Sequence, residues 1–228
     1  MTHRLWPRPL QWLLVLALPV LLVAADMRLV TGHWFVHWEY GKAGFPPDPY
    51  GLPTADRTHL AETSVDYLAT NAPLSLLANL RLPDGAVAFN ARELRHMADV
   101  QVVYNYITMA GIAAALVLLG GMVTLLVSDR TRWRAPAALL NGSMLTLGLL
   151  MTVSATMALN WGAFFTTFHR IFFESDTWTF PYSDTLIRLF PIRFWMDVAI
   201  TIVGLLVVEA VAIGGAGWIW TRRIGSDA

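Results

Sequence analysis

Long uncharged apolar runs dominate the pattern of hydrophobic and polar residues along this chain. Residues 102–127 and 135–158 contain no Asp, Glu, Lys, Arg or His. Residues 10–30 and 198–220 form two further apolar runs, the second with Glu209 as its one charged residue. An α-helix needs about 20 apolar residues to cross the hydrocarbon of a bilayer. The pattern therefore predicts an integral membrane protein with four helical spans.

The first apolar run has two interpretations. A basic segment precedes the apolar residues 12–25, and Val23-Ala24-Ala25 resembles a cleavage site, so residues 1–25 can be interpreted as a cleaved signal peptide. The apolar character continues beyond the usual length of such a peptide. This length favours a retained membrane anchor.

Basic residues gather in three segments that border the predicted spans. They are Arg4 and Arg8 before the first span, Arg130, Arg132 and Arg134 between the second and third, and Arg222 and Arg223 after the last. Cytoplasmic flanks of membrane helices are enriched in Lys and Arg. We therefore expect one membrane domain, residues 1–228, with both termini in the cytoplasm and outer loops at 31–101 and 159–197.

The first outer loop predicts a small cap. Residues 57–71 have the pattern of a short helix, and Pro83-Asp84-Gly85 favours a tight turn around which a short hairpin can form. A segment of this size has little core of its own. The expected fold is all-α, a four-helix transmembrane bundle with a small, mostly helical extracytoplasmic cap.

Composition excludes several kinds of chemistry. The chain has no cysteine, so it has no disulfide, thiol nucleophile or thiolate metal ligand. It has no glycine-rich phosphate loop, no G-x-S-x-G motif and no basic patch for nucleic acid. We expect no nucleic-acid partner.

The first candidate constellation lies just before the second span. Asn90 and Glu93 have the spacing of a capping box, so a helix should start here and continue into the span. Glu93, His96 and Asp99 recur every three residues and so share one side of that helix. A carboxylate near a histidine fixes its tautomer and raises its basicity, as a general base requires. The alternative is that Glu93 only caps the helix.

The second constellation follows the third span. Phe165, Phe168 and Phe172 form one stripe at helical spacing, with His169 beside it. An aromatic belt at the membrane interface is the alternative explanation. Because His96 and His169 are both expected on the outer side, they form a plausible active-site pair, with imidazoles within about 10 Å of each other.

Two other features are weaker. His33 and His37 are four residues apart, a spacing that suits a metal on a helix, but the sequence offers no obvious third ligand. Glu209 lies within a span, where an ionisable residue is costly and often functional. A protonated structural role near Thr146 is the alternative. We expect no metal or other cofactor.

The two histidine motifs resemble those of the bacterial lipoprotein intramolecular transacylases. The resemblance is carried by Phe89, Glu93-x-x-His96-Met97-x-Asp99-Val100, Phe168-His169-x-Ile171-Phe172-Phe173, Trp178, Phe180, Asp184-x-Leu186-Ile187, Pro191 and Phe194. It covers most of the chain, including the four-span layout. The tryptophan-rich residues 33–50 match no motif of the family.

The resemblance implies an acyltransferase of the bacterial cytoplasmic membrane, with its active site on the outer side. Enzymes of this family act on a lipoprotein whose N-terminal cysteine carries a diacylglyceryl thioether. They move the sn-2 acyl chain to the α-amine of that cysteine, which gives the N-acyl, monoacyl form. The expected partners are this lipoprotein and membrane lipids.

By the same resemblance, His96 and His169 are the catalytic residues. Glu93, Asp99 and Arg170 are expected to support them, while Phe165, Phe168, Phe172 and Trp178 bind lipid. We expect His96 to be the base because of its two carboxylates. We expect His169, among phenylalanines, to donate a hydrogen bond to the ester oxygen.

Two other functions remain open from the sequence. A non-catalytic membrane subunit would use its aromatic residues and histidines only for packing. A metal-dependent membrane hydrolase would use His33, His37, His96 and His169.

Overall fold

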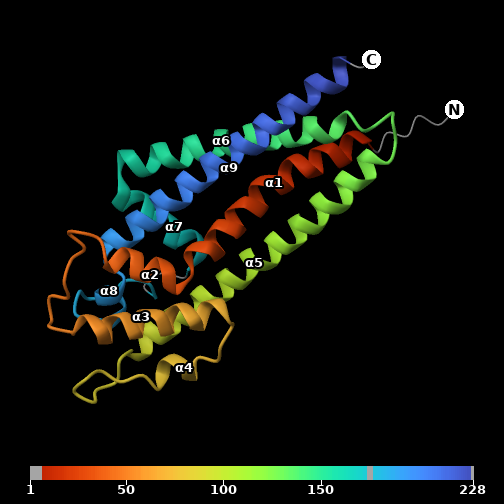
Figure 1. Ribbon diagram of the computed structural model, residues 1–228. Helices are drawn as coiled ribbons and strands as arrows, with labels where there is room; N and C mark the ends of the chain where they lie inside the picture. Colours follow the sequence, from red (N-terminus) through yellow and green to blue (C-terminus); the bar gives the residue numbers. More distant parts are fainter. Residues whose placement is uncertain (1–6, 174–176, 227–228) are drawn as a thin grey trace. The chain divides into compact units, whose positions relative to one another are not determined.

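The computed structural model describes residues 7–173 and 177–226, which form nine helices and no strand (Figure 1). Four helices are long: α1 (Pro7–Val30), α5 (Ala91–Leu126), α6 (Arg134–Leu159) and α9 (Ile192–Ser226). Five are short: α2 (His33–Tyr40), α3 (Thr54–Ala69), α4 (Ser75–Ala78), α7 (Trp161–Phe172) and α8 (Thr185–Leu189). The predicted all-α fold class is confirmed. Arg4, used to predict the topology, lies outside the described residues.

Each long helix is long and apolar enough to cross a membrane. The candidate spans are Arg8–Val30, Ala91–Leu126, Arg134–Leu159 and Ile192–Ile224. Protein buries only 17–22% of the most apolar window in the last three and 50% in the first. Apolar surface on this scale is stable against lipid rather than water. The membrane borders of the spans and the single domain remain predictions.

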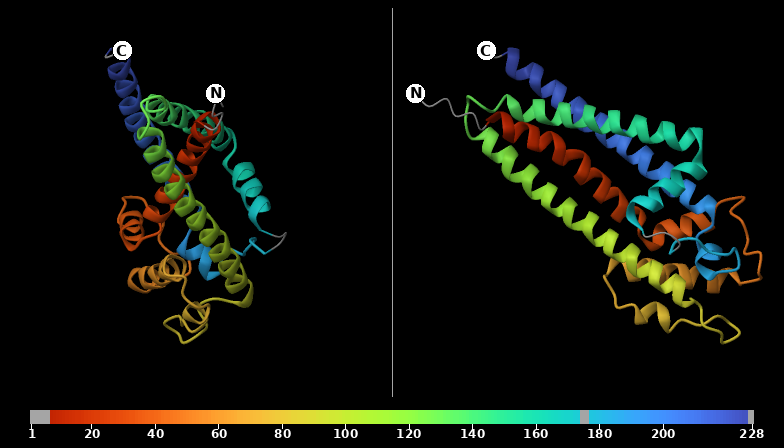
Figure 2. Two further views of the ribbon diagram at one scale, coloured as in Figure 1. Left: turned by 90° about the vertical axis from the view of Figure 1, so that its right-hand side faces the viewer. Right: turned by 180° about the vertical axis from the view of Figure 1, so that it is seen from behind.

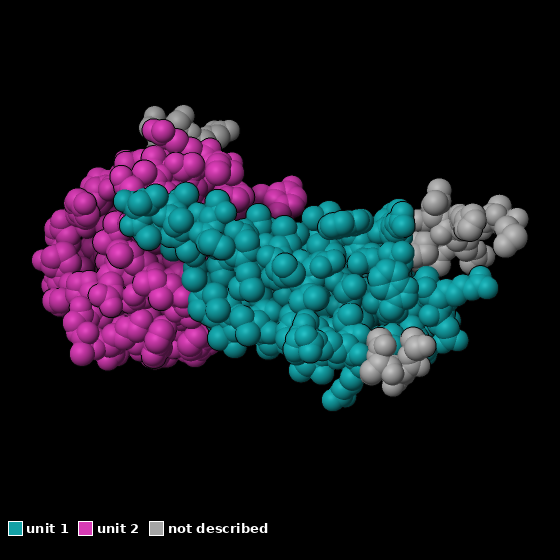
Figure 3. Space-filling model, turned by 90° about the horizontal axis from the view of Figure 1, so that it is seen from above, with its two compact units in different colours: residues 1–26, 107–159, 202–228 teal, residues 27–106, 160–201 magenta. Residues whose placement is uncertain are grey.

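The chain forms two compact units, coloured separately in Figure 3. The first unit comprises residues 1–26, 107–159 and 202–228. Its core contains Leu14, Leu18 and other buried apolar side chains. Glycines bring its helices close together, as is usual in membranes, where packing replaces the hydrophobic effect.

The second unit comprises residues 27–106 and 160–201. Within it, α3 packs against α2, α4 and α8, and Figures 1 and 2 show α2, α3 and α8 side by side. Its core includes Phe35, Leu60, Tyr67, Leu77 and Leu189, all at most 2% exposed. Both of the predicted outer loops, residues 31–101 and 159–197, supply this core, whereas the sequence predicted a cap built from the first loop. The first loop alone has too little apolar surface.

Buried ion pairs and hydrogen bonds join the two predicted outer loops within the second unit. Arg188 forms two 2.9 Å hydrogen bonds with the carboxylate of Asp48, which is almost fully buried. The Arg57 guanidinium donates to the carbonyl oxygens of Arg188 and Pro46, at 2.9 and 2.7 Å. Arg188 holds the pKa of Asp48 below its usual value, although burial of that carboxyl opposes this effect.

The predicted helix at residues 57–71 corresponds to α3. The predicted hairpin is reduced to one antiparallel bridge, between Arg81 and Val87. Gly85 adopts a φ of 85° in its turn, a conformation that glycine accepts without strain. The turn signal was correct, but too few residues pair to make strands.

Gly217 gives a test of the packing between α9 and α6. A Cβ there would lie 2.9 Å from the carbonyl oxygen of Pro136 and 3.1 Å from the amide nitrogen of Leu140. Backbone atoms cannot move aside cheaply, so Gly217→Ala should cost about 1–3 kcal/mol of stability. Thermal unfolding in detergent micelles should show a Tm lower by several degrees.

Gly215 provides the matched control, because a Cβ there has nothing within 4 Å. Alanine is the better helix former, so Gly215→Ala should leave Tm unchanged or raise it. Equal Tm values for the two variants would contradict close packing of these helices.

Candidate functional site

A capping box fixes the helical start that carries His96. The Asn90 side-chain oxygen accepts hydrogen bonds from the backbone N–H groups of Arg92 and Glu93, at 3.0 and 3.1 Å. The Glu93 carboxylate accepts one from the Asn90 N–H at 2.7 Å. The predicted capping box is therefore confirmed. It sets the phase of the helix, which places His96 on its inner side with 7% of its surface exposed.

His169 lies in the last turn of α7. Asn160 caps this helix by accepting a 2.9 Å hydrogen bond from the Ala163 N–H. The His169 Nδ1–H donates to the carbonyl oxygen of Phe165 at 2.8 Å. A carbonyl only accepts, so Nδ1 carries the hydrogen in the neutral ring and Nε2 keeps its lone pair. Such a bond fixes the tautomer that a general base needs.

The two imidazoles lie together in a box of aromatic rings. Their centroids are 6.2 Å apart and their planes are 23° from parallel. The Phe173 ring lies 5.0 Å from His96 and 5.6 Å from His169. Phe180 lies 5.4 Å from His96 on another side. The predicted proximity of the two histidines is confirmed.

Apolar surroundings favour neutral imidazole. Burial lowers the pKa of His169 below its ordinary value, although the hydrogen bond to the Phe165 carbonyl opposes this shift. A proton on one ring also disfavours a proton on the other, because the two rings are close. At neutral pH the pair can therefore accept one proton while the second ring donates an N–H.

The spacing of the residues had suggested that Glu93 hydrogen-bonds the His96 ring, but it does not. Its side chain is 1% exposed, and its second oxygen accepts a 2.7 Å hydrogen bond from the Leu186 N–H. Both oxygens are occupied by backbone groups. In the described part of the chain, His96 Nδ1 is buried with no hydrogen-bond partner. The alternative interpretation of Glu93, as a helix cap, is confirmed.

Asp99 also does not bond the His96 ring, and it faces a cavity instead. The cavity has a volume of about 380 Å³. Its lining includes Arg95, Asp99, Val102, Val103, Phe172 and Phe173. Arg170 is exposed in the last turn of α7, with no ion pair to any described residue.

The four predicted lipid-binding aromatics separate into two groups. Phe165 and Trp178 wall His169, with ring centroids 4.0 and 4.9 Å from its ring. Phe168 and Phe172 lie 5.0 Å apart and are 42% and 43% exposed. The first group shapes the histidine box, and the second presents an apolar stripe to the surroundings.

Sequence reasoning missed the contacts of Phe173 and Phe180 with His96. Both belong to the second histidine motif, but spacing along the chain does not show which ring faces a distant histidine. It also missed Arg92, which lies 5.5 Å from the Phe180 ring and pairs with Asp184 at 2.9 Å.

His33 and His37 have acidic partners on α3. His33 Nε2 lies 2.8 Å from the Asp66 carboxylate, and His37 Nε2 lies 2.7 Å from that of Glu62. Within residues 7–173 and 177–226, no group of three His, Asp or Glu side chains is placed to hold a metal ion.

Glu209 and Thr146 have separate partners. The Thr146 hydroxyl donates to the Gly142 carbonyl oxygen at 2.8 Å. Glu209 interacts electrostatically with Asp26, which is 1% exposed.

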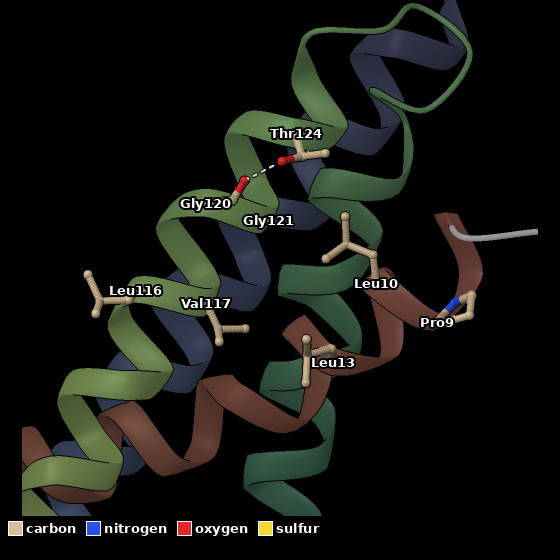
Figure 4. A pocket seen from close by; sticks show the side chains of 8 residues that line it. All are labelled: Pro9, Leu10, Leu13, Leu116, Val117, Gly120, Gly121 and Thr124. Carbon is tan, nitrogen blue, oxygen red and sulfur yellow. Dashed lines mark hydrogen bonds between the residues drawn. The ribbon is translucent and has the colours of Figure 1, made fainter. Parts of the chain in front are cut away.

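A second cavity, of about 700 Å³, lies between α1 and α5 in the first unit (Figure 4). Leu10, Leu13, Leu116 and Val117 supply most of its apolar side chains. Its polar contribution is the Thr124 hydroxyl, which already donates to the Gly120 carbonyl oxygen at 2.6 Å. Such a groove suits a lipid chain but offers no acid or base.

Comparisons with known proteins agree with the geometry. The family model for the lipoprotein intramolecular transacylase Lit matches residues 12–195. An uncharacterized protein of Aquifex aeolicus (strain VF5) is 28% identical over 185 residues, which is 81% of this chain and 82% of that protein.

Solved structures of the membrane-integral lipoprotein intramolecular transacylase Lit from Bacillus cereus share the fold. One has a TM-score of 0.73 at 20% identity and covers 97% of this chain and 98% of its own. Two structures of that protein with a histidine substituted have a TM-score of 0.66 each, at 20% identity, over 97% of this chain and 92% and 94% of theirs.

The lowered pKa of His169 predicts a pH-dependent stability. As the pH falls, His169 takes up a proton at a higher pH in the unfolded chain than in the folded chain. The folded state therefore loses stability below about pH 6.5. His169→Gln removes that loss. The decrease in Tm between about pH 7.5 and 5.5 should be smaller in the variant than in the wild type.

The control is His59→Gln, because His59 is exposed on α3. Its Tm should fall with pH as much as that of the wild type. If His169→Gln also behaved like the wild type, the imidazole would not be held neutral by burial.

Proposed function

Since the chain belongs to the lipoprotein intramolecular transacylase family, we propose that His96 and His169 carry out its acyl transfer. The protein is a multi-pass bacterial membrane protein and an acyltransferase that acts on lipoproteins. The observation that carries the assignment of the site is the stacked pair of imidazoles, 6.2 Å apart and enclosed by aromatic rings.

The proposed substrate is a lipoprotein with a diacylglyceryl thioether on its N-terminal cysteine. The α-amine of the cysteine attacks the carbonyl carbon of the sn-2 ester and loses a proton. The tetrahedral intermediate then expels the sn-2 oxygen, which takes up a proton. The products are an N-acyl amide and a free sn-2 hydroxyl in the same molecule. Because ester and amine belong to one molecule, positioning supplies much of the rate.

His169 is the general base in this proposal. Its Nδ1–H is held by the Phe165 carbonyl, so the Nε2 lone pair is available for the proton of the amine. The protonated ring then returns the proton to the departing sn-2 oxygen. The sequence had favoured His96 for this role because of Glu93 and Asp99, but Glu93 accepts from backbone N–H groups and Asp99 lines a cavity.

His96 is the oxyanion donor. A neutral imidazole N–H can stabilise the negative charge that develops on the ester oxygen, and apolar walls make such a bond stronger. Phe173 and Phe180 provide these walls, at 5.0 and 5.4 Å. Glu93 supports His96 indirectly, by fixing the helix that carries it.

The exposed stripe of Phe168 and Phe172 is proposed to receive the acyl chains, because both side chains are more than 40% exposed beside His169. Phe165 and Trp178 complete the wall at the ester. Arg170 lies at the exposed end of the same helix, where it suits the polar edge of the substrate.

Neither alternative function is favoured. A packing role does not explain why two histidines lie in a box where one of them has a fixed tautomer. A metal-dependent hydrolase would require His33 and His37 to leave their partners Asp66 and Glu62.

Conservative substitutions distinguish the two roles. His169→Gln cannot take up a proton and should lower the rate of acyl transfer by about 10²–10⁴-fold. His96→Gln keeps an N–H donor and should retain measurable activity, whereas His96→Leu should lose about 10²–10³-fold. Mass spectrometry of a diacylglyceryl lipopeptide after incubation with each purified variant measures the transfer.

An active His169→Gln beside an inactive His96→Gln would reverse the assignment. Full activity in both variants would remove the histidines from the chemistry. Wild-type Tm values in the variants would serve as the control for folding.

The proposed topology places both termini in the cytoplasm and the histidine pair on the extracytoplasmic side. The basic segments around Arg8, residues 130–134 and residues 222–223 support this orientation. A reporter fused after Arg223 that functions only in the cytoplasm should be active, and one active only outside should be silent. The reverse result would overturn the orientation.

A further inference from the structure

We propose that the cavity lined by Arg95 and Asp99 binds the α-ammonium group of the lipoprotein's N-terminal cysteine, with Asp99 as its anion. This inference rests on the acyl-transfer function proposed above, which supplies the identity of the ligand. The cavity lies against the histidine box, because Phe173 lines it and is also a neighbour of both imidazoles. Its volume of about 380 Å³ is within the range of small-molecule sites.

Among the residues that the structure describes, the two charges in this cavity have no ion-pair partner. Arg95 and Asp99 lie one turn apart on α5, yet neither forms an ion pair with the other or with any described residue. Elsewhere in the same unit, Asp48, Asp184 and Asp197 each face an arginine or lysine. Asp99 is half-buried, so a cation that enters the cavity gains a charge-assisted hydrogen bond.

The cavity has a charged end and an apolar end. Val102 and Val103 lie about 10–12 Å further along α5 than Arg95, at a rise of about 1.5 Å per residue. Phe172 and Phe173 cover the same cavity from the chain around the end of α7. A thioether with its glyceryl group fits this order, with the amine at Asp99 and the lipid against the valines and phenylalanines. Arg95 is placed to donate to the first peptide carbonyls.

Charge explains how such a site favours the substrate over the product. A free α-amine has a pKa of about 7.7–8.0, so it is mostly an ammonium ion at neutral pH. The amide formed by acyl transfer carries no charge and leaves Asp99 without a partner. Asp99 therefore holds the substrate and releases the product. It is a positioning residue, because it takes up neither proton: the ammonium ion loses one proton to solvent to become the attacking amine, and His169 removes the second during attack.

Binding of unreactive analogues tests this separately from catalysis. Two lipopeptides in which both ester chains are replaced by ethers cannot transfer a chain. One has a free α-amine and the other is N-acetylated. The full-length protein in detergent micelles should bind the free amine about tenfold more tightly, since a hydrogen bond to a charged group is of that strength.

Asp99→Asn should bring the two affinities to within about twofold, while Asp99→Glu should keep the preference. Asp129→Asn is the matched control, because Asp129 is 91% exposed and outside the cavity. It should keep the full tenfold ratio. With the ester substrate, Asp99→Asn should raise KM about tenfold and leave kcat within a few-fold.

Three results would overturn the inference. The first is a wild-type protein that binds both lipopeptides equally well. The second is a folded Asp99→Asn variant that still prefers the free amine. The third is an Asp99→Asn variant whose affinities for the two lipopeptides fall by the same factor. The third result would mean that the cavity binds the glyceryl or peptide part of the lipoprotein instead of its α-ammonium group. Absence of acyl transfer by the wild type on the ester substrate would instead refute the proposed function and leave the binding result standing.

Discussion

The site depends on one buried carboxylate, that of Glu93. One oxygen closes the capping box at Asn90, and the other binds the Leu186 N–H at the start of α8. A buried carboxylate is costly unless its oxygens are hydrogen-bonded, and here both accept from backbone groups. The same group thus fixes the phase of α5, which carries His96, and holds the segment after Phe180 beside it.

The start of α5 could be predicted because its capping box is local. The other contact of Glu93 could not, because its partner is distant in the sequence. The capping box lies within four residues, so the sequence alone revealed it. The Leu186 contact joins residues 93 apart, and no pattern along the chain indicates it. Helical spacing predicted that Glu93, His96 and Asp99 share a side, which is a statement about direction. The spacing does not show that Glu93 accepts from a backbone amide or that Asp99 faces a cavity.

The histidine pair was predictable for a different reason. Two motifs next to neighbouring predicted spans, at ends expected on the same side of the membrane, should lie at one level, so the predicted topology alone limited their separation. The structure changes only which histidine we propose as the base. The bond between His169 and the Phe165 carbonyl is a contact with the residue four positions earlier, a local signal that the sequence contained.

The aromatic box also explains why no nucleophilic serine or cysteine is needed. An intramolecular transfer already has its acceptor amine at a high effective concentration. What competes with that amine is water, and the rings of Phe165, Phe173, Phe180 and Trp178 occupy the space around the imidazoles. Excluding water strengthens the proposed hydrogen bond from His96 and keeps His169 neutral. One apolar enclosure would thus support the proposed base, the proposed oxyanion donor and a preference for transfer over hydrolysis.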